Sequence, residues 1–455
     1  MAILLTCCLS LFIVNLDATV VNVALPTIHR DLDASVSGLQ WVIDAYILVL
    51  ACLLMLGGST ADRLGRRRVF RIGLVVFGTA SILCALAPSL GWLIGFRMLQ
   101  AIGGSMLNPV AMSIITNTFT DAAERARAIG VWGGVVGISS ALGPLLGGAL
   151  VDAVSWRAIF WINVPVALTA VILTGILVPE SRAAHPRRFD PVGQVLVILI
   201  LGSLTFGIIE GADRGWSNPL IVGCFILTAV ALAGLMIYEP RRRQPLIELG
   251  FFSSLPFSGA TLIAISAFAG MSSFLFLNAL YLQNLLGMTP FQSGLHTLPM
   301  AGVTAIAAPL SGRLVSNRGP RPSLTIAGIG LTCGCVLLCL LGPHTPTWQL
   351  IITYFIFGVG FGFVNAPITN TAVSGMPRAQ AGVAAATAST SRQIGTSLGV
   401  AISGTLVIGT AAGPVPSLAN WILMVGYAVL VLALGVITSG RRARASAARV
   451  AEALG

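Results

Sequence analysis

The stretch Leu16–Pro26, LDATVVNVALP, places one carboxylate, Asp17, inside an otherwise apolar helix. A charged side chain in hydrocarbon costs several kcal/mol, about 3 kcal/mol on insertion scales. A chain keeps such a group only where it faces protein or water. We therefore expect the other helices to surround Asp17, and Asp17 to titrate or to meet a cation there. The alternative interpretation is a structural polar contact between helices.

The composition around this stretch is that of an integral membrane protein. Of the 455 residues, 56% are apolar and 9% are charged, against about 25% charged in a typical soluble domain. A helix crosses the apolar core of a bilayer with about 20 residues. Fourteen segments of that kind leave no room for a soluble domain. The predicted spans are 3–25, 41–61, 69–87, 90–118, 124–151, 158–178, 190–212, 218–238, 255–283, 292–315, 320–342, 346–372, 378–408 and 418–439.

The net charge of +11 comes from arginine alone, because the chain contains no lysine. With the loops alternating from a cytoplasmic N-terminus, all loop arginines except Arg30, Arg157 and Arg214 fall on the inside. This positive-inside asymmetry predicts a multi-pass protein of the cytoplasmic membrane with both termini in the cytoplasm. The arginines are thus expected to meet membrane lipids and not nucleic acid. The apolar run begins almost at Met1, so we expect a short N-terminal tail to precede it.

The chain divides into two similar halves. Two arginine-rich connectors, 180–190 and 239–248, bracket the seventh and eighth predicted spans. The predicted parts are therefore a six-helix bundle (1–180), a linker with two inserted helices (181–248), a second six-helix bundle (249–440) and a basic cytoplasmic tail (441–455). Aligning Gly65 with Gly319 superposes the loops 58–68 and 312–321. Repeats around a central site are common in secondary transporters.

The loop 58–68 is the most specific local pattern, and its expected gating residues are Gly58, Asp62, Arg63, Gly65, Arg66 and Arg67. Gly58 would let two helix backbones approach closely. Asp62, at a helix end, would pair with an arginine or a helix N-terminus. The arginines from Arg66 to Arg68 would anchor at cytoplasmic headgroups. Such a cluster can latch an inner gate; the alternative is that the arginines only orient the loop.

Three further charged residues lie within predicted helices. Arg97 is about two turns into its span, where a buried guanidinium requires a partner, for which Asp17 and Asp44 are candidates. A fixed interhelical hub is the alternative role of Arg97. Asp44, near Trp41, would bind a cation or act as a solvated cap. Arg392, in the middle of its span, would hold the two halves together or form an ion pair with a carboxylate. Asp17, Asp44, Arg97 and Arg392 are the predicted proton-coupling and substrate residues.

The span 124–151 carries glycines at spacings of three and four, ending in Gly143-Pro144-Leu-Leu-Gly147-Gly148. Such spacings make a smooth groove for another helix. The Gly-Pro pair removes a backbone hydrogen bond and permits a kink. This pattern suits a helix at a moving interface, although ordinary tight packing would use the same residues.

Other classes of protein lack support in this sequence. An ATP-driven pump needs a phosphate-binding loop with a lysine, which this chain does not contain. No cluster of nucleophile, base or metal ligands converges, so neither an enzyme, a metal site nor a cofactor is predicted. The eight cysteines all lie in apolar segments without a Cys-x-x-Cys pair and indicate neither disulfides nor metal. Composition alone does not exclude a channel.

Taken together, these motifs resemble those of the fourteen-helix drug:proton antiporter branch of the major facilitator superfamily. The similarity includes Leu16–Pro26, the loop 58–68, Arg97–Gly104, Gly143–Gly148, Trp156–Pro165, Tyr281–Pro299 and Arg392–Ala401. The resemblance implies an all-α major facilitator fold of two six-helix bundles plus two inserted helices. It also implies Asp17 and Arg97 in proton coupling and Asp62 in gating. Ala101 replaces a usual glycine, and Ser316 replaces the acid of the second loop.

The function implied is proton-driven export of hydrophobic, often cationic, drugs or toxic compounds by alternating access. Outward-facing, the acid would take up a proton; inward-facing, substrate would displace it. The competing interpretation is a dedicated proton-coupled exporter of one endogenous metabolite, peptide or lipid. An uptake symporter fits the resemblance less well, because the Gly-Pro motif goes with antiporters. A monomer is the default expectation.

Overall fold

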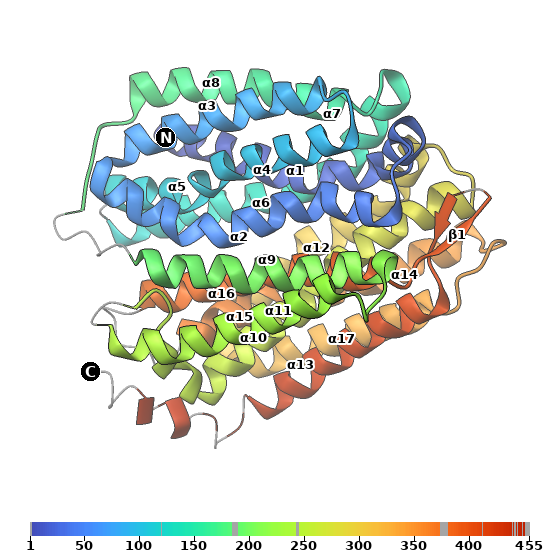
Figure 1. The fold of residues 1–455 in the computed structure, drawn as a ribbon. Coiled ribbons are helices and arrows are strands. Elements are labelled where there is room, and N and C mark those ends of the chain that lie inside the picture. The colour runs from blue at the N-terminus through green and yellow to red at the C-terminus, as the bar shows by residue number, and fades with distance from the viewer. Residues whose placement is uncertain are drawn as a thin grey trace. The chain divides into compact units, whose positions relative to one another are not determined.

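The computed structural model describes residues 2–119, 121–183, 190–242, 245–373, 381–411, 413–438, 440, 443, 445–447 and 449–450. In this part of the chain almost every element is a helix (Figure 1). The helices are α1 (Ala2–Leu32), α2 (Val36–Leu64), α3 (Arg66–Ala85), α4 (Leu90–Ser105), α5 (Leu107–Thr118), α6 (Ala122–Ala153), α7 (Ala158–Trp161), α8 (Asn163–Leu177), α9 (Pro191–Arg214), α10 (Pro219–Tyr238), α11 (Leu255–Leu280), α12 (Pro290–Arg318), α13 (Pro320–Leu338), α14 (Thr347–Gly362), α15 (Asn365–Val373), α16 (Ala381–Gly404) and α17 (Leu418–Ile437).

Short elements complete this set. Two 3₁₀ turns, Glu239–Arg241 and Leu249–Ser253, follow α10, and a π-helical turn, Tyr281–Leu285, extends α11. The strands β1 (Ile408–Thr410) and β2 (Gly413–Val415) pair antiparallel, with Ile408 opposite Val415.

Twelve helices of the described residues are long and apolar enough to cross a membrane. They coincide with twelve of the fourteen predicted spans. The fifth and thirteenth predicted spans coincide with α6 and α16, which are 32 and 24 residues long but are not among the twelve. The prediction of an all-α membrane protein is confirmed. The count of fourteen spans stays a prediction.

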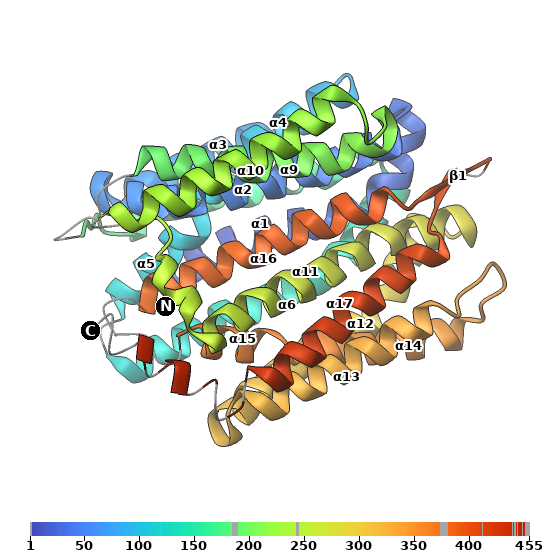
Figure 2. The ribbon, with the colours of Figure 1, turned by 60° about the horizontal axis from the view of Figure 1, so that its bottom comes forward.

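The described chain separates into two compact units, residues 1–194 with 288–295 and residues 195–287 with 296–455. In the first unit, α1 packs against α6 and α8, and α3 packs against α4 and α8. In the second unit, α11 packs against α16 and α17, and α13 packs against α14 and α17; Figure 2 shows α11 and α16 side by side. The pairs α1–α6 and α11–α16 are equivalent, as are α3–α4 and α13–α14.

The repeat extends to the interruptions of the helices. The fourth predicted span divides at Met106 into α4 and α5, and its counterpart in the second unit divides after Gly362 into α14 and α15. Gly65 and Gly319, which the sequence alignment superposes, both have positive φ angles, of 112° and 79°. Glycine adopts this conformation without the steric cost that other residues meet. The two units therefore repeat one pattern of helix packing and loop geometry.

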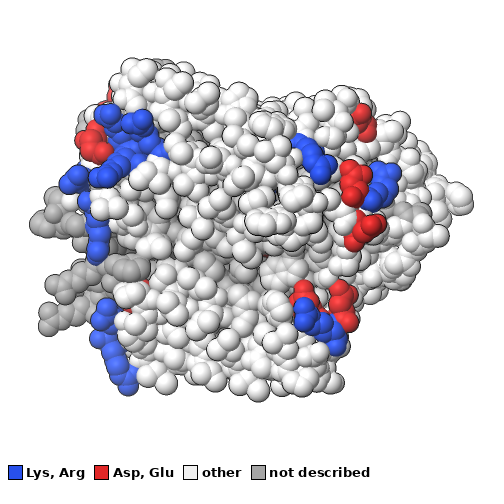
Figure 3. All heavy atoms as spheres, turned by 45° about the horizontal axis from the view of Figure 1, so that its top comes forward, with Lys and Arg blue, Asp and Glu red and all other residues white. Residues whose placement is uncertain are grey.

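The outer surface of the helices is apolar. The helix α10 has only three buried residues, Ile221, Ala231 and Leu235, so its apolar side chains are exposed nearly all round. On the face drawn in Figure 3, charged side chains gather near the helix ends and the surface between them carries none. Exposed apolar surface of this extent marks contact with another apolar phase, which for helices of this length is the bilayer.

Candidate functional site

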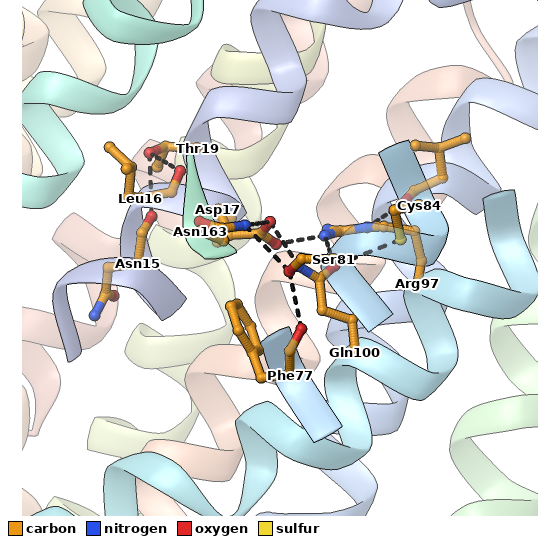
Figure 4. A network of polar contacts seen from close by, with 12 residues as sticks. Asn15, Leu16, Asp17, Thr19, Phe77, Ser81, Cys84, Arg97, Gln100 and Asn163 are labelled. Carbon is orange, nitrogen blue, oxygen red and sulfur yellow. Dashed lines mark hydrogen bonds and ion pairs between the residues drawn. The ribbon is translucent and has the colours of Figure 1, made fainter. Parts of the chain in front are cut away.

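Asp17 lies at the centre of a buried polar network in the first unit (Figure 4). Its side chain is fully buried, as is that of Arg97 on α4, and the guanidinium Nη1 of Arg97 donates to Oδ2 of Asp17. The two residues are 80 positions apart in the chain. The expectation that protein surrounds Asp17 is confirmed. Of the two candidate partners for Arg97, Asp17 is the one with which it forms an ion pair.

Three polar side chains complete the contacts of this pair. Oδ1 of Asp17 accepts hydrogen bonds from Nε2 of Gln100 at 2.9 Å and from Nδ2 of Asn163 at 2.8 Å. Gln100, one turn after Arg97 on α4, also accepts from Nη1 of Arg97 at 2.6 Å and donates to the Ser81 hydroxyl at 2.9 Å. Charge-assisted hydrogen bonds of this kind are about twice as strong as neutral ones. The ionised carboxylate is therefore well solvated by protein.

Helix α2 supports the guanidinium from the other side. Nε of Arg97 donates to the carbonyl of Val42 at 3.2 Å, and Cζ lies 4.2 Å from the centroid of the Tyr46 ring. Residues four apart share one face of a helix, so Val42 and Tyr46 contact the guanidinium from the same side of α2. A second ring, that of Phe160, lies 5.8 Å from Cζ. Cation–π contacts stabilise a desolvated guanidinium by about 2 kcal/mol or more.

Asp44 differs from one of its two predicted roles. Its side chain is fully buried, so it is not a solvated cap. The cap of α2 is Ser35, whose side chain accepts from the Gly38 amide at 3.1 Å, nine residues earlier. Asp44 is two positions from both Val42 and Tyr46, and therefore points to the opposite side of α2 from the residues that hold Arg97.

Arg392 lies near the middle of α16 in the second unit, as predicted, and is partly buried. Its Nη2 donates to the Thr369 hydroxyl at 2.7 Å, and its Cζ lies 6.0 Å from the ring centroid of Phe268. Its contact in the described part of the chain is thus with a neutral hydroxyl. A role in substrate binding or in joining the halves stays a prediction.

The loop 58–68 contains an ion pair. Asp62, at the end of α2, accepts from Nη2 of Arg66 at 2.8 Å and from its Nε at 3.1 Å. The predicted pairing of Asp62 with an arginine is confirmed. Arg66 differs from its predicted position at the headgroups, because it is only 7% exposed. The ion pair with Asp62 keeps this guanidinium buried at the start of α3. Arg68, two residues later, is exposed.

Glu180, which sequence reasoning did not select, binds the N-terminus of α3. Its Oε1 accepts from the Arg67 amide at 3.1 Å and its Oε2 from the Arg68 amide at 3.2 Å. The N-terminus of a helix carries unpaired N–H groups and a partial positive charge, which a carboxylate satisfies. The chain after α8 also pairs with this loop through its backbone, as the Arg66 amide donates to the Ser181 carbonyl at 2.9 Å.

The close helix approach predicted for Gly58 occurs at its neighbour. A Cβ atom on Gly57 would lie 2.5 Å from the Ser105 carbonyl oxygen, whereas one on Gly58 would meet Pro109 at an ordinary 3.5 Å. Gly65 is constrained differently: its φ is 112°, and a Cβ there would lie 2.6 Å from Glu180. The two glycines that the geometry requires here are thus Gly57, directly before the loop, and Gly65 within it.

Two glycines of α6, Gly143 and Gly147, pack closely against another helix, as their spacing predicts, whereas Gly134 has no atom within 4 Å and positions 130, 133 and 137 lie outside the described side-chain positions. Gly143 and Gly147 contact Thr19 and Val20 of α1, within one turn of Asp17. Gly148 faces the other way and contacts the first residues of α12, which belong to the same compact unit. Pro144 lies within the helix, whose assignment continues on both sides of it. The role of this helix at a moving interface stays a prediction.

Comparison with known proteins agrees with this geometry. The family model of the Major Facilitator Superfamily matches residues 7–400. The chain is 35% identical over 399 residues to the Multidrug resistance protein Stp of Mycobacterium tuberculosis, covering 88% of this chain and 74% of that protein. It is 31% identical over 433 residues to the Methylenomycin A resistance protein of Bacillus subtilis, covering 95% and 91%.

A solved structure gives the same fold. A POT family transporter, crystallised in complex with 5-aminolevulinic acid, superposes with a TM-score of 0.70 over 95% of this chain and 94% of its own. Its sequence identity is 15%, so the likeness is one of fold alone. With the match of the family model, the relatives that cover nearly the whole chain and the repeated helical units, the chain is a multi-pass membrane protein that belongs to the Major Facilitator Superfamily.

Proposed function

We propose that this protein exports hydrophobic, mostly cationic, drugs or toxic compounds across the cytoplasmic membrane in exchange for protons. The observation that carries the proposal is the fully buried ion pair of Asp17 and Arg97 inside a transmembrane unit. An ionisable pair in such a place is a functional site by default. The relatives named as multidrug and antibiotic resistance proteins support export as the direction of transport.

The proposed cycle follows from the charges of this pair. A proton that binds Asp17 neutralises the carboxylate and leaves Arg97 as a buried cation, held by the Tyr46 ring and the Val42 carbonyl. A buried charge that loses its counter-ion is unfavourable by several kcal/mol, so protonation favours a rearrangement of α1 and α4. A cationic substrate competes with the proton for the same carboxylate. Exchange results without a further coupling device.

The proposal includes the orientation of the protein in the membrane, its lipid contacts and its oligomeric state. The arginine asymmetry favours cytoplasmic termini, and the basic side chains at the inner loops would contact anionic membrane lipids. We further propose that the protein works as a monomer, since a single chain contains both repeats of the fold.

A dedicated exporter of one compound is the second candidate, and the resemblance to a Methylenomycin A resistance protein favours it. Dye efflux from inverted vesicles, with and without a pH gradient, separates the two. A pH-dependent response to many unrelated cations indicates the broad exporter. A response to a single compound indicates the narrow one.

Asp17→Asn is expected to abolish ethidium accumulation in inverted vesicles energised by a pH gradient, because a carboxamide does not take up a proton. The variant should still insert, since the apolar span is unchanged and the carboxamide keeps one acceptor oxygen for the amides of Gln100 and Asn163. The control is Glu210→Gln, which removes a carboxylate that pairs with the half-exposed Arg214 near the end of α9. Full transport by Asp17→Asn would refute the role of Asp17.

We also propose that the loop 58–68 acts as a gate, with Glu180 as its second anchor. Glu180→Gln removes the charge at the N-terminus of α3, a contribution of about 0.3–1 kcal/mol. Hydrogen exchange at the Arg67 and Arg68 amides should then accelerate about two- to fivefold. Glu124→Gln, an acidic residue in the first turn of α6, is the control. Unchanged exchange at both amides would contradict the anchoring role.

A further inference from the structure

Asn163 is a carboxamide at the first residue of α8, a helix that is otherwise almost entirely apolar. Its side chain is fully buried, and its Nδ2 donates to Oδ1 of Asp17 at 2.8 Å. The contact joins residues 146 positions apart. Trp156, a few residues earlier, donates through Nε1 to Oδ2 of Asp31 at 2.9 Å. The segment from Trp156 to Asn163 is therefore hydrogen-bonded to α1 at two positions, Asp31 and Asp17.

The two amides around Asp17 differ in how firmly they are held. Gln100 is fixed by Arg97 at its Oε1 and by the Ser81 hydroxyl at its Nε2, in addition to Asp17. Asn163 makes its one short hydrogen bond to Asp17, and a longer one of 3.5 Å to Ser81. Its own carbonyl oxygen, Oδ1, is buried and has no hydrogen-bond partner in the described part of the chain. A buried acceptor without a partner is unfavourable and needs an explanation. A hydrogen bond to this oxygen in another state of the protein would supply one.

We propose that Asn163 is a positioning residue that sets the protonation equilibrium of Asp17. Its N–H donates to the ionised carboxylate and holds it. When Asp17 gains a proton, the carboxyl becomes an O–H donor, and rotation of the Asn163 carboxamide presents Oδ1 as its acceptor. The proton stays on Asp17 throughout, and Asn163 neither gains nor loses one. The inference rests on the proposed function, because it concerns the same carboxylate.

The other groups around Asp17 are few enough for one amide to matter. The helices α5, α7 and α8 contain no titratable residue, and those of α6 lie in its first six and last two positions. The titratable residues of the neighbouring helix interiors that interact with Asp17 are Arg97 on α4, Tyr46 on α2 and Cys84 on α3, whereas Asp44 points to the opposite side of α2. Only Arg97 bonds directly to Asp17 among these in the described contacts, so the remaining direct contacts are neutral amides.

Infrared titration of the purified full-length protein tests this inference without a substrate. The carbonyl stretch of a protonated carboxylic acid appears as the pH falls, and the part of the signal lost in Asp17→Asn belongs to Asp17. Asn163→Leu removes both the donor to the ionised form and the acceptor for the protonated form. The bond to the ionised form is charge-assisted and therefore the stronger one, so the proton should be held more tightly. The pH midpoint of the Asp17 signal is expected to move about one unit toward alkaline pH, a tenfold change in proton affinity.

A near-isosteric variant and a matched control accompany this measurement. Asn163→Asp keeps the shape but places a second carboxyl beside Asp17, and the midpoint should move further toward alkaline pH, because two like charges resist ionising together. Thr174→Val, on the same helix, removes a buried hydroxyl that donates within α8, to the Ala170 carbonyl at 2.6 Å, and has no other hydrogen bond in the described part of the chain. The midpoint of this control should equal that of the unmodified protein.

The outcomes separate the inference from the proposed function. If Asp17 titrates but the Asn163→Leu midpoint is unchanged, Asn163 has a structural role only and the inference is overturned, whereas proton coupling by Asp17 stands. If no signal belongs to Asp17 at any pH at which the protein is folded, both fail. If Asn163→Leu does not fold, an Asn163→Asp midpoint equal to that of the unmodified protein overturns the inference, because a carboxyl in contact with Asp17 must shift it.

Discussion

Replacing Arg97 with methionine is expected to abolish transport and to destabilise the folded protein by about 3–5 kcal/mol, the usual cost of leaving one charge of a buried pair uncompensated. Methionine fills much of the same volume without charge. It removes the donor to Oδ2 of Asp17 and leaves Gln100 and Asn163 as the side-chain donors to that carboxylate in the described part of the chain. Asp17 then avoids part of the cost by keeping its proton, which by itself ends the exchange of a proton for cargo.

The double variant Asp17→Asn/Arg97→Met separates stability from transport. Because it removes both charges, it should regain most of the stability lost in Arg97→Met, as replaced buried pairs often do. Transport should remain absent. Thermal denaturation in detergent and ethidium uptake by inverted vesicles measure the two properties. An Arg97→Met protein as stable as the unmodified one would show that the pair does not hold α1 and α4 together.

Much of this site could be predicted from sequence because its charges stand alone in apolar helices. Asp17 and Arg97 are conspicuous there, and the cost of burying each one requires a partner. Their pairing was one of the alternatives that remained open, since spacing within a helix says nothing about which distant helix lies opposite. Ser81 was missed, and Asn163 was noted only within the stretch Trp156–Pro165 that carries the resemblance, with no role predicted for it. An uncharged polar residue in a membrane helix has many possible partners. The signal that could have found Asn163 is its position as a carboxamide directly before the long apolar run of α8.

The loop 58–68 shows where a sequence pattern is less precise. Asp62 and Arg66 are four residues apart, but they lie on two helices on either side of Gly65, so their ion pair depends on the turn at that glycine. The close approach at Gly57 and not at Gly58 depends on the helix rotation, which two adjacent glycines leave open. Glu180 is 113 residues from the amide it binds, and no local pattern indicates that contact. The helical architecture, by contrast, follows from hydropathy, because within a bilayer a chain must satisfy its backbone hydrogen bonds internally.

Gly148→Ala is expected to reduce transport more than tenfold. A methyl group there would lie 2.7 Å from the Phe291 Cα and 2.8 Å from the Pro290 carbonyl carbon. These are backbone atoms at the start of α12 and cannot rotate away, so α6 and the first residues of α12, which belong to the same compact unit, must separate. The cost of such overpacking is about 1–3 kcal/mol. Separation also breaks the hydrogen bond from the Phe291 amide to Asp152 at the end of α6, which measures 2.9 Å.

Gly134→Ala is the matched control for Gly148→Ala, because it adds the same methyl group to the same helix where no atom lies within 4 Å. Alanine should stabilise α6 there by about 0.5–1 kcal/mol through its higher helix propensity. If the close contact and not helix propensity limits transport, Gly134→Ala keeps its transport whereas Gly148→Ala loses most of it. Ethidium uptake and thermal denaturation of both proteins test this. Equal transport by the two variants would mean that α6 tolerates a wider spacing from α12, and that the glycines of this helix serve packing without a role in the cycle.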